Sequence, residues 1–202
     1  FPTRRSSDLP VNHPALRRQT VSDLLHRTAK RLPHKTGIVC GATTWTWAQF
    51  DAVVSRLAAG LHAQGVAQGE HVGVLSRNSH GFAALRFALA RLGAVMVPVN
   101  FMLNADEAAY ILRHAGVKLL AVDSGLHALG RDAAGRDTQI SRFLWLPSED
   151  PSTCPDGCLD FNTLIATDLA AHPCPEPSFN SHHLLQIVYT SGTESLPKGA
   201  ML

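Results

Sequence analysis

Apolar residues between Phe50 and Leu61 recur at intervals of three and four, which is the spacing of one face of a helix. Thr46 and Gln49 stand just ahead of this run at the spacing of a capping box, in which each side chain bonds the other residue's backbone N–H. Gly65 follows the run, and glycine readily ends a helix. The pattern therefore predicts a helix over residues 46–64.

The residues that follow alternate short apolar runs with further helical patterns. Asn104 can cap one of these helices, and Asp106 and Glu107 favour the positive end of its dipole. The predicted strands are 71–75, 94–99, 117–122 and 142–146, and the predicted helices are 79–92, 104–114 and a short one between the last two strands. Such alternation predicts an α/β fold with a largely parallel sheet flanked by helices.

The segments at either side of this unit are less regular. Residues 21–32 predict an amphipathic helix and residues 37–47 a hairpin that turns at Gly41. The Pro-rich region 147–183 predicts a long loop with one helical turn near 161–165. The first nine residues, FPTRRSSDL, resemble adapter-derived sequence, so we expect residues 1–9 to be non-native and residues 10–202 to form the domain.

Composition excludes several classes of partner. A net charge of +2 over 202 residues is too small for an electrostatic footprint on nucleic acid or an anionic membrane. The most apolar stretch, residues 82–101, is interrupted by Arg86, Arg91 and Pro98, so we expect no transmembrane segment. The N-terminus lacks the apolar core of a secretory signal, and a cytoplasmic location is therefore expected.

Cysteine and histidine offer one weak candidate for a metal site. Cys154, Cys158 and Cys174, with His182 or His183, carry the ligand types of a zinc site, but their spacing matches none of the usual pairs. We interpret the cysteines as surface thiols and expect no metal site.

The segment YTSGTESLPKG, residues 189–199, carries the strongest chemical signal. It follows the predicted strand 186–189, and ligands of open α/β sheets bind beyond the carboxyl ends of strands. Gly192 allows a tight turn whose N–H groups form an anion nest, the hydroxyls add donors, and Lys198 adds a point charge. This chemistry indicates a polyphosphate ligand. The Walker pattern does not fit, because Pro197 takes the second glycine position and Gly199 follows the lysine.

This segment resembles the phosphate-binding signature of the AMP-forming adenylate-forming enzymes, which include acyl-CoA synthetases, luciferases and peptide-synthetase adenylation domains. Glu194-Ser195 stands where Thr-Gly is commoner, a variant similar to acyl-CoA synthetases for fatty or related acids. The stretches GEHVGVLSRNSHGFAALRFALARLGAVMVPVN (69–100) and LNADEAAYILRHAGVK (103–118) extend the resemblance over nearly the whole chain. It implies an incomplete N-terminal domain of an acyl-CoA synthetase-like fold, a partial AMP-binding domain over residues 10–202.

The resemblance also implies an activity. A carboxylic acid reacts with ATP to give an acyl-adenylate and pyrophosphate, and the thiol of CoA then forms a thioester and releases AMP. The loop would hold the ATP phosphates through its hydroxyl, glycine, acidic and lysine positions, which are Thr190, Ser191, Gly192, Thr193, Glu194, Ser195, Lys198 and Gly199. We expect no catalytic residue within these 202 residues, with the Mg²⁺ ligands and the catalytic lysine beyond Leu202.

Several expectations accompany this assignment. A helix beyond Leu202 should pack behind the loop, and the 202 residues alone should bind ATP at best weakly and be inactive. Arg77 and Asn78 are interpreted as a solvated loop end, and His114 as a partner of the helix dipole. Two alternatives stay open, a non-catalytic nucleotide-binding or scaffold domain and a peptide-synthetase adenylation domain, the latter disfavoured by Glu194. The acyl chain length and the oligomeric state are left undetermined.

Overall fold

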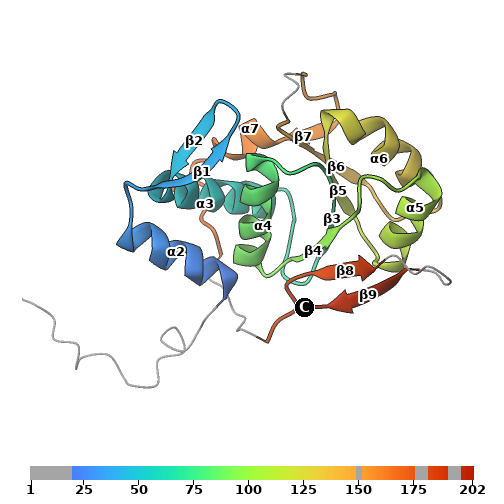
Figure 1. Cartoon of the computed structure of the whole chain (residues 1–202), viewed down its shortest axis with the longest axis horizontal. Coiled ribbons are helices and arrows are strands. Elements are labelled where there is room, and N and C mark those ends of the chain that lie inside the picture. The colour runs from blue at the N-terminus through green and yellow to red at the C-terminus, as the bar shows by residue number, and fades with distance from the viewer. Residues whose placement is uncertain (1–19, 149–151, 176–181, 191–196) are drawn as a thin grey trace, which may run out of the picture.

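Figure 1 shows the computed structural model of the chain, which describes residues 20–148, 152–175, 182–190 and 197–202. Its centre is a sheet of five parallel strands in the order β4-β3-β5-β6-β7. The strands are β3 (His71–Leu75), β4 (Val95–Pro98), β5 (Leu119–Asp123), β6 (Arg142–Leu146) and β7 (Cys158–Asp160). The predicted α/β fold with a largely parallel sheet is confirmed.

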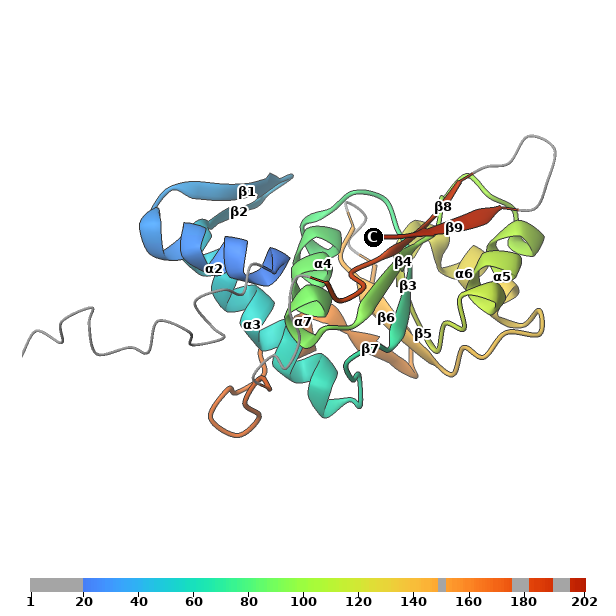
Figure 2. The ribbon, with the colours of Figure 1, turned by 90° about the horizontal axis from the view of Figure 1, so that it is seen from below.

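Helices cover both faces of the sheet (Figure 2). Helices α3 (Trp47–Ala63) and α4 (His80–Leu92) lie on one face, and α5 (Ala105–His114) and α6 (His127–Ala134) lie on the other. In β5, Leu119 and Ala121 belong to the core beneath α3 and α4, whereas Leu120 and Val122 belong to the core beneath α5 and α6. Strands buried on both faces are apolar at nearly every position, which explains the almost continuous apolar runs in the sequence.

Side-chain caps fix where the helices begin. Thr46 and Gln49 form the predicted capping box of α3, with hydrogen bonds of 2.8 and 3.2 Å. Asn104 and Glu107 form a second box at α5, in which both hydrogen bonds are 3.0 Å. Gly93 ends α4 with a φ of 68°, a left-handed conformation that glycine adopts at little cost. The predicted boundaries of these helices hold to within one residue.

The first described elements also follow the prediction. Helix α2 (Val21–Arg31) is followed by a hairpin of β1 (Thr36–Cys40) and β2 (Thr43–Thr46) that turns at Gly41, where φ is 55°. Figure 1 places this hairpin and α2 beside α3, away from α5 and α6.

The arginines that interrupt the apolar stretch 82–101 have specific partners. Arg91 of α4 is only 12% exposed and pairs with Asp51 of α3 at 2.7 Å, and it also donates to Ser22 of α2 at 3.0 Å. Arg86 donates to the side chain of Gln186 at 2.8 Å. These two arginines therefore connect α4 to elements on either side of it.

The Pro-rich region 147–183 contains a strand that the sequence analysis did not predict. Residues Cys158–Asp160 form β7, which pairs in parallel with β6. A three-residue strand is too short to show a period, and it forms because β6 offers an edge of unpaired backbone groups. The predicted helical turn in this region is α7 (Phe161–Leu164), and the short 3-10 helix η2 (Ser124–Leu126) precedes α6.

The chain ends in a second, two-stranded sheet. The predicted strand 186–189 corresponds to β8 (Ile187–Thr190), which pairs antiparallel with β9 (Lys198–Met201). An isolated parallel bridge joins Gln186 to Met96 and connects this hairpin to β4. The proposed non-native residues 1–9 lie outside the described residues.

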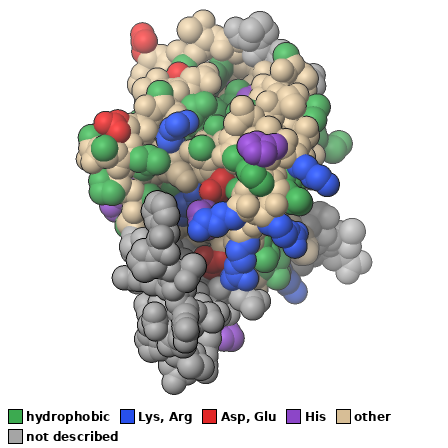
Figure 3. Space-filling view, turned by 90° about the vertical axis from the view of Figure 1, so that its left-hand side faces the viewer, with side chains coloured by type: hydrophobic (Ala, Val, Ile, Leu, Met, Phe, Trp, Pro, Cys, Tyr) green, Lys and Arg blue, Asp and Glu red, His purple; other side chains and the backbone are tan. Residues whose placement is uncertain are grey.

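Charges are mixed on the face that carries α2. Figure 3 shows Lys and Arg side chains gathered there with acidic and histidine side chains among them, and Arg27, Lys30 and Arg31 of α2 are exposed. Within the described residues, none of the helices combines the length and apolarity needed to cross a bilayer.

Candidate functional site

The β8–β9 hairpin brings the two ends of the hydroxyl-rich loop together. In its register Thr190 lies opposite Lys198, and Tyr189 lies opposite Gly199. The Thr190 hydroxyl donates to the carbonyl oxygen of Lys198 at 3.5 Å, and both side chains are exposed. Thr190, Lys198 and Gly199 are thus the predicted phosphate-binding residues that the structure places, while Ser191, Gly192, Thr193, Glu194 and Ser195 lie outside the described residues.

The element that directly follows the loop is a strand, and the helix expected beyond Leu202 stays a prediction. Residues Lys198–Met201 form β9, and Leu202 extends the pairing through hydrogen bonds of 3.0 and 3.2 Å with the backbone of Gln186. Glycine is a poor helix former, so Gly199 weakens any helix here. The exposed backbone of β8 meanwhile offers partners for the N–H and C=O groups of this segment, and strand pairing satisfies them.

Tyr189 attaches the hairpin to helix α5. Its hydroxyl lies 2.6 Å from Nδ1 of His114, and the two rings meet edge to face at 5.7 Å. Tyr110, one turn earlier in α5, stacks on His114 with ring centroids 5.7 Å apart. Burial, with a smaller contribution from Tyr110, raises the pKa of Tyr189 above its ordinary value, so its phenol is neutral near neutral pH.

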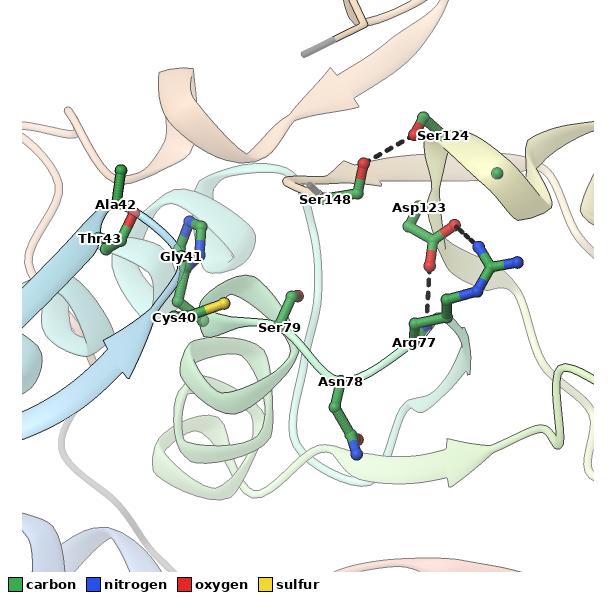
Figure 4. A pocket seen from close by; sticks show the side chains of 12 residues that line it. Cys40, Gly41, Ala42, Thr43, Arg77, Asn78, Ser79, Asp123, Ser124 and Ser148 are labelled. Carbon is green, nitrogen blue, oxygen red and sulfur yellow. Dashed lines mark hydrogen bonds and ion pairs between the residues drawn. The ribbon is translucent and has the colours of Figure 1, made fainter. Parts of the chain in front are cut away.

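A hollow of about 700 Å³ opens at the carboxyl ends of β3, β5 and β6 (Figure 4). The tip of the β1–β2 hairpin forms one wall, and the turn between β3 and α4 forms another. Its lining residues are Cys40, Gly41, Ala42, Thr43, Arg77, Asn78, Ser79, His80, Asp123, Ser124, Gly125 and Ser148. This is the edge at which parallel α/β sheets generally bind ligands.

Asp123 organises the polar side of the hollow. It is 1% exposed, accepts from the backbone N–H of Arg77 at 2.7 Å and lies 3.7 Å from the Arg77 guanidinium (Figure 4). Ser124 and Ser148 share a hydrogen bond of 2.7 Å across the same opening. A buried carboxylate needs such partners, because its desolvation is costly. Arg77 and Asn78, interpreted from the sequence as a solvated loop end, line this hollow.

His80 lines the hollow and packs among aromatic rings. It meets Trp45 edge to face at 5.2 Å and Phe161 at 6.2 Å. Its Nδ1 is buried without a hydrogen-bond partner among the described residues, and burial lowers the pKa of His80. The imidazole is therefore neutral at neutral pH, where it packs as an aromatic side chain.

The loop ends and the hollow are separate features in this structure. None of the described loop residues lines the hollow, and Figure 1 shows the free end of the β8–β9 hairpin beside α5, away from the β1–β2 hairpin. Asp123 was not among the site residues predicted from the sequence. An aspartate at the end of an apolar run was the available signal, since such a position lies at the ligand-binding edge of a parallel sheet.

The cysteines do not assemble a metal site in the described part of the chain. No group of three or more His, Cys, Asp or Glu side chains there is arranged to hold a metal ion. Cys158 instead lies 3.9 Å from Nε2 of His127, and Cys154 lies 3.8 Å from the carbonyl oxygen of Cys158. Burial raises the pKa of both thiols, that of Cys154 to about 11, which makes each a poor ligand and a poor nucleophile near neutral pH.

The sequence is similar to a known family of enzymes and to ligases of other organisms. Residues 25–202 match the family described as AMP-binding enzyme. A peroxisomal benzoate–CoA ligase of Arabidopsis thaliana is 30% identical over 197 residues, which cover 91% of this chain and 33% of the relative. A fatty acid–[acyl-carrier-protein] ligase, ScoC, of Streptomyces coeruleorubidus is 30% identical over 192 residues, covering 95% of this chain and 34% of the relative.

A solved structure shows the same fold. The N-terminal domain of FACL13 from Mycobacterium tuberculosis superimposes with a TM-score of 0.77 and 26% identity, covering 91% of this chain and 44% of that one. The chain spans about a third of the length of the curated relatives it matches.

Proposed function

Because the chain belongs to the family of AMP-binding enzymes, we propose that the complete protein is an ATP-dependent, AMP-forming acyl-CoA synthetase. A carboxylate oxygen attacks the α-phosphorus of ATP, the bond to the β-phosphate oxygen breaks, and pyrophosphate leaves. The CoA thiol then attacks the acyl carbon of the adenylate, and AMP leaves. Both relatives described above are named as ligases that join a carboxylic acid to a thiol-bearing acceptor.

One observation carries the role of this chain: β8 and β9 set Thr190 opposite Lys198 at the two ends of the loop. The charge that develops on pyrophosphate needs fixed donors and a cation. The loop supplies hydroxyls and N–H groups from Thr190, Ser191, Gly192, Thr193 and Ser195, and Lys198 supplies the cation. Glu194 and Gly199 complete the set of residues that we assign to the phosphate site.

The cofactors of the reaction follow from the same proposal. ATP and CoA are substrates, and Mg²⁺ would neutralise phosphate charge when bound. The described residues contain no carboxylate cluster suited to a metal ion, so we assign none of them to Mg²⁺. A cytoplasmic location remains a prediction, and the Arabidopsis relative is named as peroxisomal.

The test is carboxylate-dependent exchange of labelled pyrophosphate into ATP by the purified complete protein. A panel of aromatic, short-chain and long-chain carboxylic acids identifies the acid, and the release of AMP with CoA or with a phosphopantetheinyl carrier protein identifies the thiol. We expect exchange with at least one acid and AMP release with CoA. An absence of exchange across the panel would refute the proposed activity.

Removal of the Lys198 ammonium group tests whether the loop binds phosphate. Lys198→Ala should slow exchange by a factor equivalent to about 2–4 kcal/mol, the range for losing one donor to a developing negative charge. Thr193→Val, which removes one hydroxyl, should act in the same direction. Lys118→Ala is the matched control, because Lys118 is also an exposed lysine but lies between α5 and β5. Equal losses in the two lysine variants would exclude a specific role for Lys198.

A further inference from the structure

Helix α5 contacts the hairpin one residue before the loop begins. We propose that His114 is a positioning residue of the phosphate loop: through Tyr189 it fixes the free end of the β8–β9 hairpin and so the separation and orientation of Thr190 and Lys198. The inference rests on the proposed function for the ligand of the loop, but its geometry stands on described residues alone.

The contact constrains the Tyr189 side chain in direction as well as distance. Its hydroxyl lies 2.6 Å from Nδ1 of His114, although the two residues are 75 positions apart in the sequence. The His114 ring is itself held by stacking on Tyr110, at an interplanar angle of 27°. Because aromatic pairs and hydrogen bonds both depend on orientation, this arrangement fixes where the Tyr189 ring can lie.

The Tyr189 ring in turn covers the opposite strand. Tyr189 pairs with Gly199 across the hairpin. A Cβ atom at Gly199 would lie 3.2 Å from Cζ of Tyr189 and 2.9 Å from Cγ2 of Ile187. The ring therefore lies over the backbone of β9 at the residue next to Lys198, so a constraint on the ring is a constraint on both strands.

The other end of the hairpin has separate attachments. Gln186 accepts from Arg86 of α4 at 2.8 Å, and the backbone N–H of Met96 donates to Leu185 at 3.0 Å. Beyond Gln186, the described residues show one hydrogen bond between a β8 side chain and a helix, which is the contact of Tyr189 with His114 of α5. Loss of this contact should therefore loosen the loop end of the hairpin and leave its base in place.

The experiment compares His114→Ala, His114→Asn and Tyr189→Phe in the complete protein. His114→Ala and Tyr189→Phe should each raise the KM for ATP about five- to tenfold, the effect of one lost hydrogen bond, with the KM for the carboxylic acid unchanged. The double variant should be no worse than either single one, since both remove the same bond. His114→Asn, whose amide can replace Nδ1, should restore most of the ATP affinity.

The matched control is His71→Ala. His71 also bonds the carboxyl end of α5, through Nδ1 and the Ala115 carbonyl oxygen at 2.5 Å, but among the described residues no hydrogen bond joins its side chain to the hairpin. We expect this variant to keep the wild-type KM for ATP. An increase as large as that of His114→Ala would mean that disturbing α5 in general, and not the Tyr189 contact, affects the loop, and the inference would be wrong.

Amide hydrogen exchange separates this inference from the proposed activity. In the absence of nucleotide, His114→Ala should speed exchange at the β8 and β9 amides near Thr190 and Lys198 and leave Gln186 unchanged. Unchanged exchange at the loop end would refute the positioning role even if the protein is an active synthetase. Faster exchange in a protein without pyrophosphate exchange would support the positioning role while the proposed function fails.

Discussion

The Arg91 side chain links three helices, and its removal should destabilise the protein. The Arg91 guanidinium donates to Asp51 at 2.7 Å, to Ser55 at 2.5 Å and to Ser22 at 3.0 Å. It thereby joins α4 to both α2 and α3. We expect Arg91→Met, which keeps most of the apolar stem, to lower the free energy of unfolding.

The magnitude follows from burial. The side chains of Arg91 and Asp51 are 12% and 16% exposed, so the variant leaves Asp51 largely desolvated without its main partner. Breaking a buried pair in this way costs about 3–5 kcal/mol. In the variant, Asp51 keeps its contact with His26, which lies 3.0 Å away and is 52% exposed to solvent. This residual partner reduces the expected loss to about 2–4 kcal/mol.

Urea denaturation of wild type, Arg91→Met, Asp51→Asn and the double variant measures the pair directly. The double variant should be more stable than the sum of the two single losses predicts, by about 1–3 kcal/mol. Arg136→Met is the control, because Arg136 pairs with Asp132, at 3.0 Å, and with Asp106 near the surface, where its side chain is 39% exposed and both carboxylates are more than half exposed. Additive losses in the Arg91 cycle, or a loss for Arg91→Met no greater than for Arg136→Met, would refute this reasoning.

Three further changes test other parts of the structure. Burial lowers the pKa of His80 below 6.5, so the stability that the neutral imidazole contributes is present above pH 6.5 and is lost as the pH falls through its folded pKa. In urea denaturation, His80→Phe should therefore lose less free energy of unfolding between pH 7 and pH 5 than wild type does. Equal losses in the two proteins would contradict this. Because the pKa of Cys154 is raised from 9.0 to about 11, its alkylation by iodoacetamide at pH 8 should be about 100-fold slower than that of a free thiol of pKa 9. The free energy of unfolding that the neutral thiol contributes should also fall as the pH rises from 9 to 11. Peptide mass spectrometry measures the alkylation rate, and a rate like that of a free thiol would refute the burial of Cys154. Gly199→Ala should cost about 1–3 kcal/mol in urea denaturation by overpacking against Ile187, and an unchanged midpoint would show that the hairpin adjusts freely.

The parts of the fold that the sequence predicted are those with a local signal. The capping boxes at Thr46 and Asn104 and the apolar runs of β3, β5 and β6 each depend on residues within one element, so their pattern is complete in the sequence. Strand β7 depends on a partner instead: Cys158–Asp160 is a strand because the edge of β6 lies beside it. A pattern of three residues cannot predict that such a partner strand lies beside them.

The candidate site divides in the same way. The phosphate-binding role of Lys198 and the hydroxyls stays a prediction, and it could be made because these residues lie close together in one short segment of the sequence. The roles of Arg77 and Asp123 arise across 46 positions, through a hydrogen bond between the turn after β3 and the end of β5. His114 was interpreted as a partner of the dipole of its own helix, and its contact with Tyr189 spans 75 positions. A single sequence does not show which residues so far apart come into contact in the fold.

The pairing of β8 with β9 affects the free energy cost of ordering the loop. Holding a free segment in one conformation costs about 1–2 kcal/mol per residue. A hairpin reduces the conformations open to the loop, because the Thr190–Lys198 pair already fixes its two ends and closes it. The affinity for a triphosphate should therefore depend on whatever keeps β8 and β9 in register. Tyr189 lies opposite Gly199 in that register, and His114 holds Tyr189. Substitutions of Tyr189 and His114 should therefore act on nucleotide binding without touching the nucleotide.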